Sequence, residues 1–85
     1  MAWDIRYHPQ ADRDIDRLDP LIRRRVLAAI GALAQEPRAA ANAKALKGSD
    51  RHRIRVGDWR VIYTLHDDVL LVLVLRVAHR REAYR

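Results

Sequence analysis

The chain has 85 residues, no cysteine and a net charge of +6, and this length predicts one domain spanning residues 1–85. The absence of cysteine excludes disulfide bridges and thiolate metal sites. The longest apolar run, from Val69 to Leu75, is far shorter than the roughly 20 residues that cross a bilayer. We therefore expect a cytoplasmic protein with no membrane contact, whose basic charge favours a polyanionic partner such as nucleic acid, the ribosome or an acidic protein.

The N-terminal half predicts a short strand followed by two helices. Residues 3–7 alternate apolar and polar side chains, as in a strand. Pro9 suits the first turn of a helix, and Asp19-Pro20 separates this helix from a second one, with Asp19 as its N-cap. We expect the two helices to run antiparallel. The three acidic side chains of the first helix are assigned to its solvated face: Asp12, Asp14 and Asp16.

The second helix is predicted to end before Pro37 and to carry one apolar stripe. The stripe consists of Ile22, Val26, Ala29, Ile30 and Leu33. A run of three basic residues lies mainly off this stripe: Arg23, Arg24 and Arg25. Residues 39–46 are rich in alanine and are expected to form either a short helix or a mobile connection.

The C-terminal half predicts a three-stranded antiparallel meander. Residues 51–56 and 59–66 both alternate, and Gly57-Asp58 suits a two-residue hairpin loop. Asp67-Asp68 is assigned to a second tight turn. The aliphatic segment from Val69 to Val77 is typical of a central strand that is covered on both faces. The predicted fold class is α+β, with two N-terminal antiparallel helices packed on a curved antiparallel sheet made of the N-terminal strand and the meander.

The predicted hairpin places several arginines together. With a two-residue loop, Arg55 lies opposite Arg60 and shares a face of the sheet with Arg53, while apolar residues occupy the face toward the helices. Like charges in direct opposition destabilise a sheet, and no acidic residue of these two strands shares that face. We therefore predict a bound anion there. The alternative is that the arginines extend into solvent, where screening makes their repulsion small.

Four aliphatic side chains are expected beside these arginines. They are Ile62, Leu71, Leu73 and Leu75. An apolar patch next to a cationic one is not expected to stay exposed. We interpret it as the contact surface of a partner chain; the alternative is that the C-terminal tail folds over it.

The C-terminal tail, residues 79–85, contains the groups that RNA cleavage requires. The 2′-hydroxyl must lose a proton, the charge on the phosphorane must be stabilised, and the leaving oxygen must be protonated. Arginine can stabilise the charge but stays protonated. His79 and Tyr84 are therefore the two tail residues that can transfer protons. We find no glycine-rich phosphate loop, paired carboxylates or metal-ligand cluster, and we expect neither cofactor nor metal.

These segments resemble a known family. Lys47-Gly48, residues 52–63 and residues 78–84 are similar to the RelE branch of the RelE/ParE toxins of type II toxin–antitoxin systems. The resemblance implies a metal-independent endoribonuclease (an mRNA interferase) that cleaves mRNA in the ribosomal A site. It also implies a RelB-like antitoxin that wraps the toxin in an oligomeric complex and masks or deforms its site.

The resemblance assigns roles to individual residues. Arg53 and Arg55 occupy the basic pair of the first hairpin strand, Arg60 follows the aromatic residue of the second, and Arg80 and Tyr84 match the catalytic tail residues. The first pair is often lysine in relatives, which can lose a proton where arginine cannot. Proton abstraction therefore shifts to His79 or Tyr84, or the site relies on electrostatics and alignment. The catalytic set is predicted as Arg53, Arg55, Arg60, His79, Arg80 and Tyr84.

Binding surfaces for the antitoxin and for RNA are also predicted, and two alternative functions remain. The antitoxin is expected on the aliphatic patch, and RNA or ribosome contacts are expected from Arg23, Arg24, Arg25, Arg51 and Arg81. One alternative is a ParE-like protein that inhibits DNA gyrase without cutting RNA. It would share the fold but would not need the tail residues, whose presence favours the nuclease. The other alternative is an inactive member retained with its antitoxin.

Overall fold

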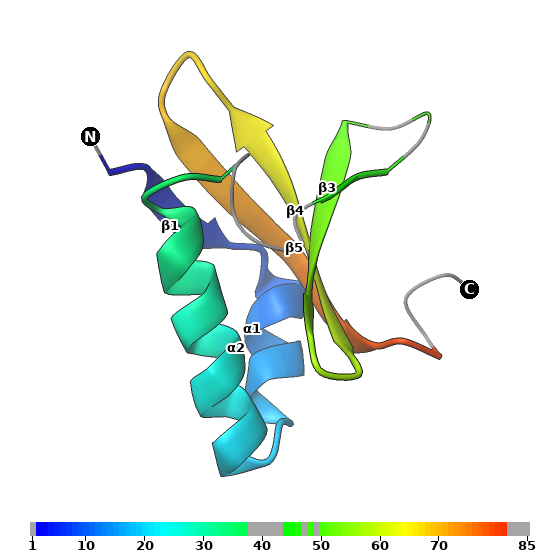
Figure 1. Ribbon diagram of the computed structural model, residues 1–85. Coiled ribbons are helices and arrows are strands. Elements are labelled where there is room, and N and C mark those ends of the chain that lie inside the picture. Colours follow the sequence, from blue (N-terminus) through cyan, green and yellow to red (C-terminus); the bar gives the residue numbers. More distant parts are fainter. Residues whose placement is uncertain (1, 38–43, 47, 49, 82–85) are drawn as a thin grey trace.

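The computed structural model describes residues 2–37, 44–46, 48 and 50–81. Its elements in chain order are β1 (Asp4–Tyr7), α1 (Pro9–Asp16), α2 (Pro20–Leu33), β2 (Lys44–Ala45), β3 (Arg51–Val56), β4 (Trp59–His66) and β5 (Leu71–His79). The five strands form one sheet in the order β1-β5-β4-β3-β2, and the two antiparallel helices lie together on one side of it (Figure 1). Neither helix in these ranges has the length and apolar character needed to cross a membrane.

The sheet confirms the predicted architecture of two helices on a strand layer and adds two features to it. β1 pairs with β5 in parallel, so the sheet is mixed rather than wholly antiparallel. Within the alanine-rich segment, Lys44 and Ala45 pair with Arg53 and His52 as the short strand β2, while residues 38–43 lie outside the described part of the chain. A two-residue strand has no alternation that a sequence pattern could reveal.

Both helices begin where the sequence predicts. The Nδ1 atom of His8 accepts the amide hydrogen of Gln10 at 3.0 Å, and Pro9 takes the first helical position of α1. At α2, Asp19 Oδ2 accepts the amide hydrogen of Leu21 at 3.1 Å, and Pro20 follows the cap. Each cap satisfies an amide that the helix itself leaves without an acceptor.

The core lies between the helices and the sheet. The α2 residues that are fully buried in it are Val26, Ile30 and Leu33, and full burial of such a side chain contributes about 1.5–3 kcal/mol. Tyr63 of β4 is also completely buried, and its hydroxyl donates to the carbonyl oxygen of Pro37 at 3.1 Å. Burial raises the pKa of this phenol. The core therefore holds a neutral tyrosine whose polar end has a partner.

The two turns of the meander differ. Gly57-Asp58 is a two-residue loop, as predicted, and Gly57 adopts a left-handed φ of 61° that glycine tolerates. The second turn is longer than the predicted Asp67-Asp68 turn: His66 pairs with Leu71, so residues 67–70 form the loop and β5 begins at Leu71 instead of Val69. Leu70 supplies the left-handed conformation there, with φ 49°, because this loop contains no glycine.

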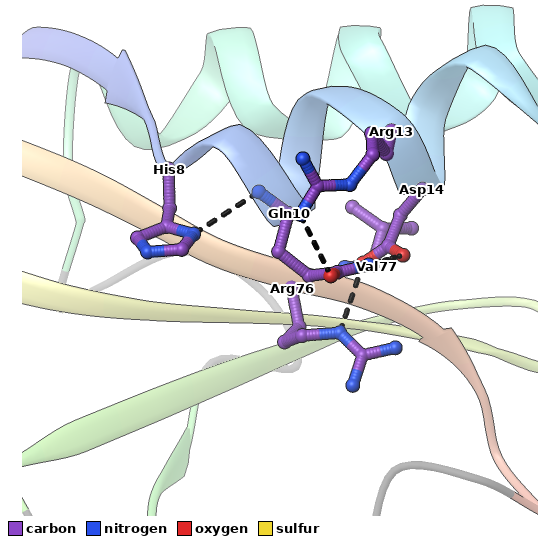
Figure 2. Close-up of polar contacts among 6 residues, drawn as sticks. All are labelled: His8, Gln10, Arg13, Asp14, Arg76 and Val77. Atoms are coloured by element: carbon purple, nitrogen blue, oxygen red, sulfur yellow. Dashed lines mark hydrogen bonds and ion pairs between the residues drawn. The ribbon is translucent and has the colours of Figure 1, made fainter.

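α1 completes the edge of β5 where β1 ends. β1 pairs with β5 only from Leu71 to Val74. Beyond Val74, Asp14 of α1 binds β5 instead. Its Oδ2 accepts the backbone N–H of Val77 at 2.9 Å and the Nε–H of Arg76 at 3.0 Å (Figure 2). Its Oδ1 accepts a hydrogen bond from Gln10 Nε2 at 2.9 Å. Asp14 is thus buried against the sheet, which corrects its assignment to the solvated face.

The environment of Asp14 makes its ionised form the stable one. Burial by itself raises the pKa of this carboxyl, but the hydrogen bonds from Val77, Arg76 and Gln10 together with the charge of Arg76 outweigh it, so the pKa lies below its ordinary value of 3.8. A group with a depressed pKa in the folded state stabilises the fold above its unfolded-state pKa. That stabilisation is lost as the pH falls through the lower folded-state pKa.

We predict that Asp14→Ala lowers the free energy of unfolding by about 2–4 kcal/mol at pH 7, because a buried amide and Arg76 lose their acceptor. Urea denaturation measured from pH 7 downward should show the difference between variant and wild type shrinking below about pH 4. Asp16→Ala, an exposed change on the same helix, should cost less than about 0.5 kcal/mol. A difference that persists unchanged in acid would contradict this account of Asp14.

Candidate functional site

The sheet carries three arginines on the face opposite the helices. Arg55 lies directly opposite Arg60 in the register of β3 and β4, and Arg53 lies opposite Ile62, as predicted from the two-residue loop. The alternate residues of the same strands belong to the core or pack against it: Ile54, Val56, Trp59, Val61 and Tyr63. We call the surface formed by Arg53, Arg55 and Arg60 the arginine face.

The arginine face combines burial with positive charge. Arg53 and Arg60 are each only 8% exposed, whereas Arg55 is exposed. The side chain of Arg53 has no hydrogen bond or ion pair with another residue that the structure describes. β3, β4 and β5 contain no acidic residue. Burying the Arg53 cation without a counter-charge is costly, and Arg55 and Arg60 carry like charges directly opposite each other across the strands. A bound anion would relieve both effects.

Arg80 lies at the end of the hairpin that carries the arginine face. Its backbone N–H donates to the carbonyl oxygen of Asp58 at 2.7 Å, and its Nε lies 3.9 Å from Asp58 Oδ1. The ion pair is weak because both side chains are exposed, but the backbone bond sets where the chain leaves β5. Ala78, two residues earlier, pairs with Arg60, so the structure brings Arg80 close to the arginine face.

Four of the other predicted cations are exposed in the structure. Arg51 is exposed at the start of β3, and Arg81 is exposed just after β5. Arg24 and Arg25 are exposed on α2. Tyr84 lies outside the described residues, so its predicted role stays a prediction.

His79 is not part of the arginine face, so the structure separates it from Arg53, Arg55 and Arg60 within the predicted catalytic set, and its catalytic role stays a prediction. It pairs with Trp59 across β4 and β5, and the two rings meet edge to face with their centroids 5.4 Å apart and their planes at 87°. Trp59 packs against the core on the helix side of the sheet. Side chains alternate along a strand, so His79 points to the side opposite that of Ala78 and its partner Arg60.

Arg23 also has a different role from the expected RNA contact. Its guanidinium donates to three backbone carbonyl oxygens, those of Ile15 at 3.1 Å and Asp16 at 2.9 Å at the end of α1 and that of Leu18 at 3.0 Å in the turn between the helices. The last carbonyls of a helix have no partner within the helix. Arg23 satisfies them and ties α2 to α1, and this occupies its guanidinium.

The aliphatic patch lies on the same side of the sheet as the arginine face. Leu71 and Leu73 pair with His66 and Thr64, and Ile62 pairs with Arg76. Leu75 falls at the irregularity in the β4–β5 pairing, where it has no partner. Ile62 is already buried, whereas the three leucines are half-buried. We call Leu71, Leu73 and Leu75 the leucine patch.

Among the described residues, the arginine face offers positive charge rather than a proton acceptor. His66 shares this side of the sheet, but it hydrogen-bonds Thr64 at 3.0 Å and lies six residues along β4 from Arg60. His52 stacks on Tyr63 with the ring centroids 5.6 Å apart. No three histidine or acidic side chains within the described ranges are grouped to hold a metal ion. This arrangement can bind an anion and stabilise developing negative charge.

Comparisons with known proteins identify relatives along almost the whole chain. A model of the ParE toxin of type II toxin–antitoxin systems (parDE) matches residues 5–84. The toxin RelG of Mycobacterium tuberculosis is 31% identical over 86 residues, covering 100% of this chain and 99% of that protein.

Solved structures of toxin–antitoxin complexes contain chains with the same fold. The toxin–antitoxin complex RelBE2 of Mycobacterium tuberculosis contains a chain with a TM-score of 0.82 and 31% identity, covering 94% of this chain and 100% of that one. The archaeal RelE–RelB complex of Pyrococcus horikoshii contains one with a TM-score of 0.84 and 27% identity, covering 98% of this chain and 100% of that one.

We predict that the contacts of Arg23 stabilise the folded state. Arg23→Ala should lower the free energy of unfolding by about 1–3 kcal/mol, because three carbonyl groups lose a charged donor and the two helices lose their link. Arg24→Ala, an adjacent change with the same loss of charge but an exposed side chain, should stay within about 0.5 kcal/mol. Chemical denaturation of both variants measures this. Equal stability of the two would contradict the structural role of Arg23.

Proposed function

This chain belongs to the ParE toxin family of type II toxin–antitoxin systems, within the RelE/ParE superfamily, and we propose that it is an endoribonuclease that cleaves mRNA on the ribosome. The observation that carries the proposal is the arginine face, with Arg80 beside it. Several guanidinium groups on one small surface match the needs of an RNA phosphodiester. Each can make two parallel hydrogen bonds to phosphate oxygens.

In the proposed reaction, the 2′-oxygen of the RNA attacks the adjacent phosphate and the 5′-oxygen leaves. Arg53 and Arg60, the buried pair, hold the scissile phosphate, while Arg55 and Arg80 contact it from the exposed side. Charge that builds on the phosphorane then meets donors already in place, and such preorganised donors are worth most where water is excluded. Since arginine stays protonated, we assign proton transfer or its alignment to Tyr84.

The ribosome is proposed to complete the substrate site. We assign contacts with ribosomal RNA or flanking mRNA to four exposed arginines: Arg24, Arg25, Arg51 and Arg81. Arg23 is not among them, because its guanidinium already binds the end of α1. Contacts of this kind set affinity through phosphate charge and depend on salt concentration.

The match to a ParE model keeps gyrase inhibition as a second candidate function. A gyrase inhibitor would need the same fold but no phosphate-binding centre. The two candidates differ in what an arginine-face substitution does, since removing a catalytic guanidinium affects RNA cleavage strongly and leaves binding to a protein target largely unchanged.

We predict that Arg53→Ala and Arg60→Ala each reduce mRNA cleavage on ribosomes by about 100-fold or more, because each removes a donor to the transition state. Arg17→Ala, an exposed change of equal charge on the helix side, serves as the matched control and should cleave normally. Mapping of mRNA 5′ ends after brief expression measures cleavage, and circular dichroism verifies folding. Intact transcripts together with inhibited gyrase supercoiling would reject the nuclease in favour of the second candidate.

An antitoxin similar to RelB is proposed to cover the leucine patch. The two similar solved structures are both toxin–antitoxin complexes. Leu71, Leu73 and Leu75 are half-buried on the side of the sheet that also carries the arginine face. An antitoxin that places apolar side chains on the patch and acidic ones near the arginines would match both surfaces, in an oligomeric complex.

Leu73→Glu should weaken antitoxin binding at least about tenfold, because it places a charge in an apolar contact. Leu21→Glu offers a matched control, since Leu21 is exposed on α2, on the other side of the molecule, and it should bind as the wild type does. Isothermal titration with the antitoxin encoded beside the toxin gives the affinities. Undiminished binding by Leu73→Glu would place the antitoxin elsewhere.

A further inference from the structure

A groove lies on the helix side of the sheet, where α2 meets the β3–β4 hairpin. Its volume is about 480 Å³, within the range of about 300–1,000 Å³ that small ligands occupy. Ile22 and Arg25 of α2 line it on one side, and Val56, Asp58, Trp59 and His79 line it on the other. The proposed phosphate chemistry does not use this groove, but the groove is lined by His79, which lies outside the arginine face.

The groove offers two aromatic rings arranged as a corner. The Trp59 and His79 planes stand at 87° with their centroids 5.4 Å apart, and both residues are only half-buried. A flat heterocycle can stack on one ring while its edge contacts the other. Stacking of this kind accepts any nucleobase, because every base presents a π-face.

Charge at the groove also suits a nucleotide. Arg25 lines it as an exposed cation with a guanidinium that can bind a phosphate. Asp58 lines it too, and its backbone and side chain contact Arg80, which lies beside the arginine face. The groove and the arginine face therefore adjoin the same hairpin turn from opposite sides of the sheet, and a single strand that passes this turn meets both.

We propose that this groove binds one nucleotide of the RNA substrate next to the cleaved bond, with its base against Trp59 and His79 and its phosphate on Arg25. The proposal deepens the ribonuclease function and rests on it for the identity of the ligand. In this proposal His79 is a binding residue that holds the base, not a group that moves protons.

The direct test is a titration of the Arg53→Ala protein, in which the phosphate centre is weakened, with guanosine 5′-monophosphate, followed by NMR. We expect shifts at the Trp59 indole and the His79 ring. The Trp3 indole is an internal control, because Trp3 lies at the other end of α2, its backbone N–H bound to the carbonyl of Ala34. Ribose 5-phosphate, which lacks a base, should shift the two groove rings much less. Equal shifts from both compounds, or none, would overturn the proposal.

Variants separate a binding role from a structural one. His79→Ala and Arg25→Ala should each weaken binding of the nucleotide at least about fivefold, with amide spectra otherwise like the wild type, whereas Arg17→Ala should not change it. In ribosomal cleavage assays the same two variants should raise KM with little change in kcat. Unaltered nucleotide affinity in both variants would refute the site.

The outcome also distinguishes this proposal from the one it rests on. Cleavage of mRNA by a protein whose groove rings do not respond to the nucleotide removes the groove and leaves the ribonuclease intact. A groove that binds the nucleotide in a protein that cuts no mRNA removes the ribonuclease and leaves a nucleotide site.

Discussion

The register of the β3–β4 hairpin determines which residues of the two strands face the helices and which form the arginine face. A two-residue loop with Gly57 in the left-handed region places Arg55 against Arg60. A slip of one residue would exchange the two faces of a strand, turning arginines into the core and Ile54 or Val61 into solvent. The apolar residues packed under the helices thus hold the arginines together, although these repel each other. The hydrophobic face supplies the energy that maintains the charged one.

Asp14 extends this constraint to the C-terminal end of the sheet. β1 is too short to pair with all of β5, and the carboxylate of Asp14 accepts the backbone N–H of Val77 that a longer strand would have bound. This bond secures β5 two residues before His79 and three before Arg80. α1 therefore acts on the candidate site without touching it, by fixing the strand that delivers Arg80 to the hairpin turn.

Much of this was predictable from the sequence, because it depends on local patterns. Alternation along β3 and β4, a glycine in a two-residue loop and the Asp19-Pro20 cap are each encoded in a few adjacent residues. Two of the differences between prediction and structure come from interactions between distant segments. The direction of β1 depends on its pairing with β5, and the role of Asp14 depends on an amide 63 residues away. The four-residue turn has no glycine to mark it, since Leu70 takes the left-handed conformation.

His79 and Arg23 show a second limit, which concerns side-chain direction. His79 precedes Arg80 of the candidate site, and an imidazole can transfer protons, but alternation along β5 directs its side chain to Trp59. This outcome was in principle accessible, because the partner of Ala78 is Arg60 and the next residue must point the other way. The role of Arg23 cannot be predicted from alternation, since its three carbonyl partners belong to the end of α1 and the turn that follows it.

The two proposed ligands of the sheet exclude each other for a physical reason. The leucine patch and the arginine face lie on the same side of one small sheet, so an antitoxin large enough to bury the leucines also covers or neutralises the arginines. An acidic antitoxin segment and an RNA phosphate then compete for the same guanidinium groups. Repulsion among these arginines destabilises the free toxin, and either ligand relieves it. Under the two proposals above, the arginine face would serve catalysis when RNA is bound and inhibition when the antitoxin is bound, with no change of fold required.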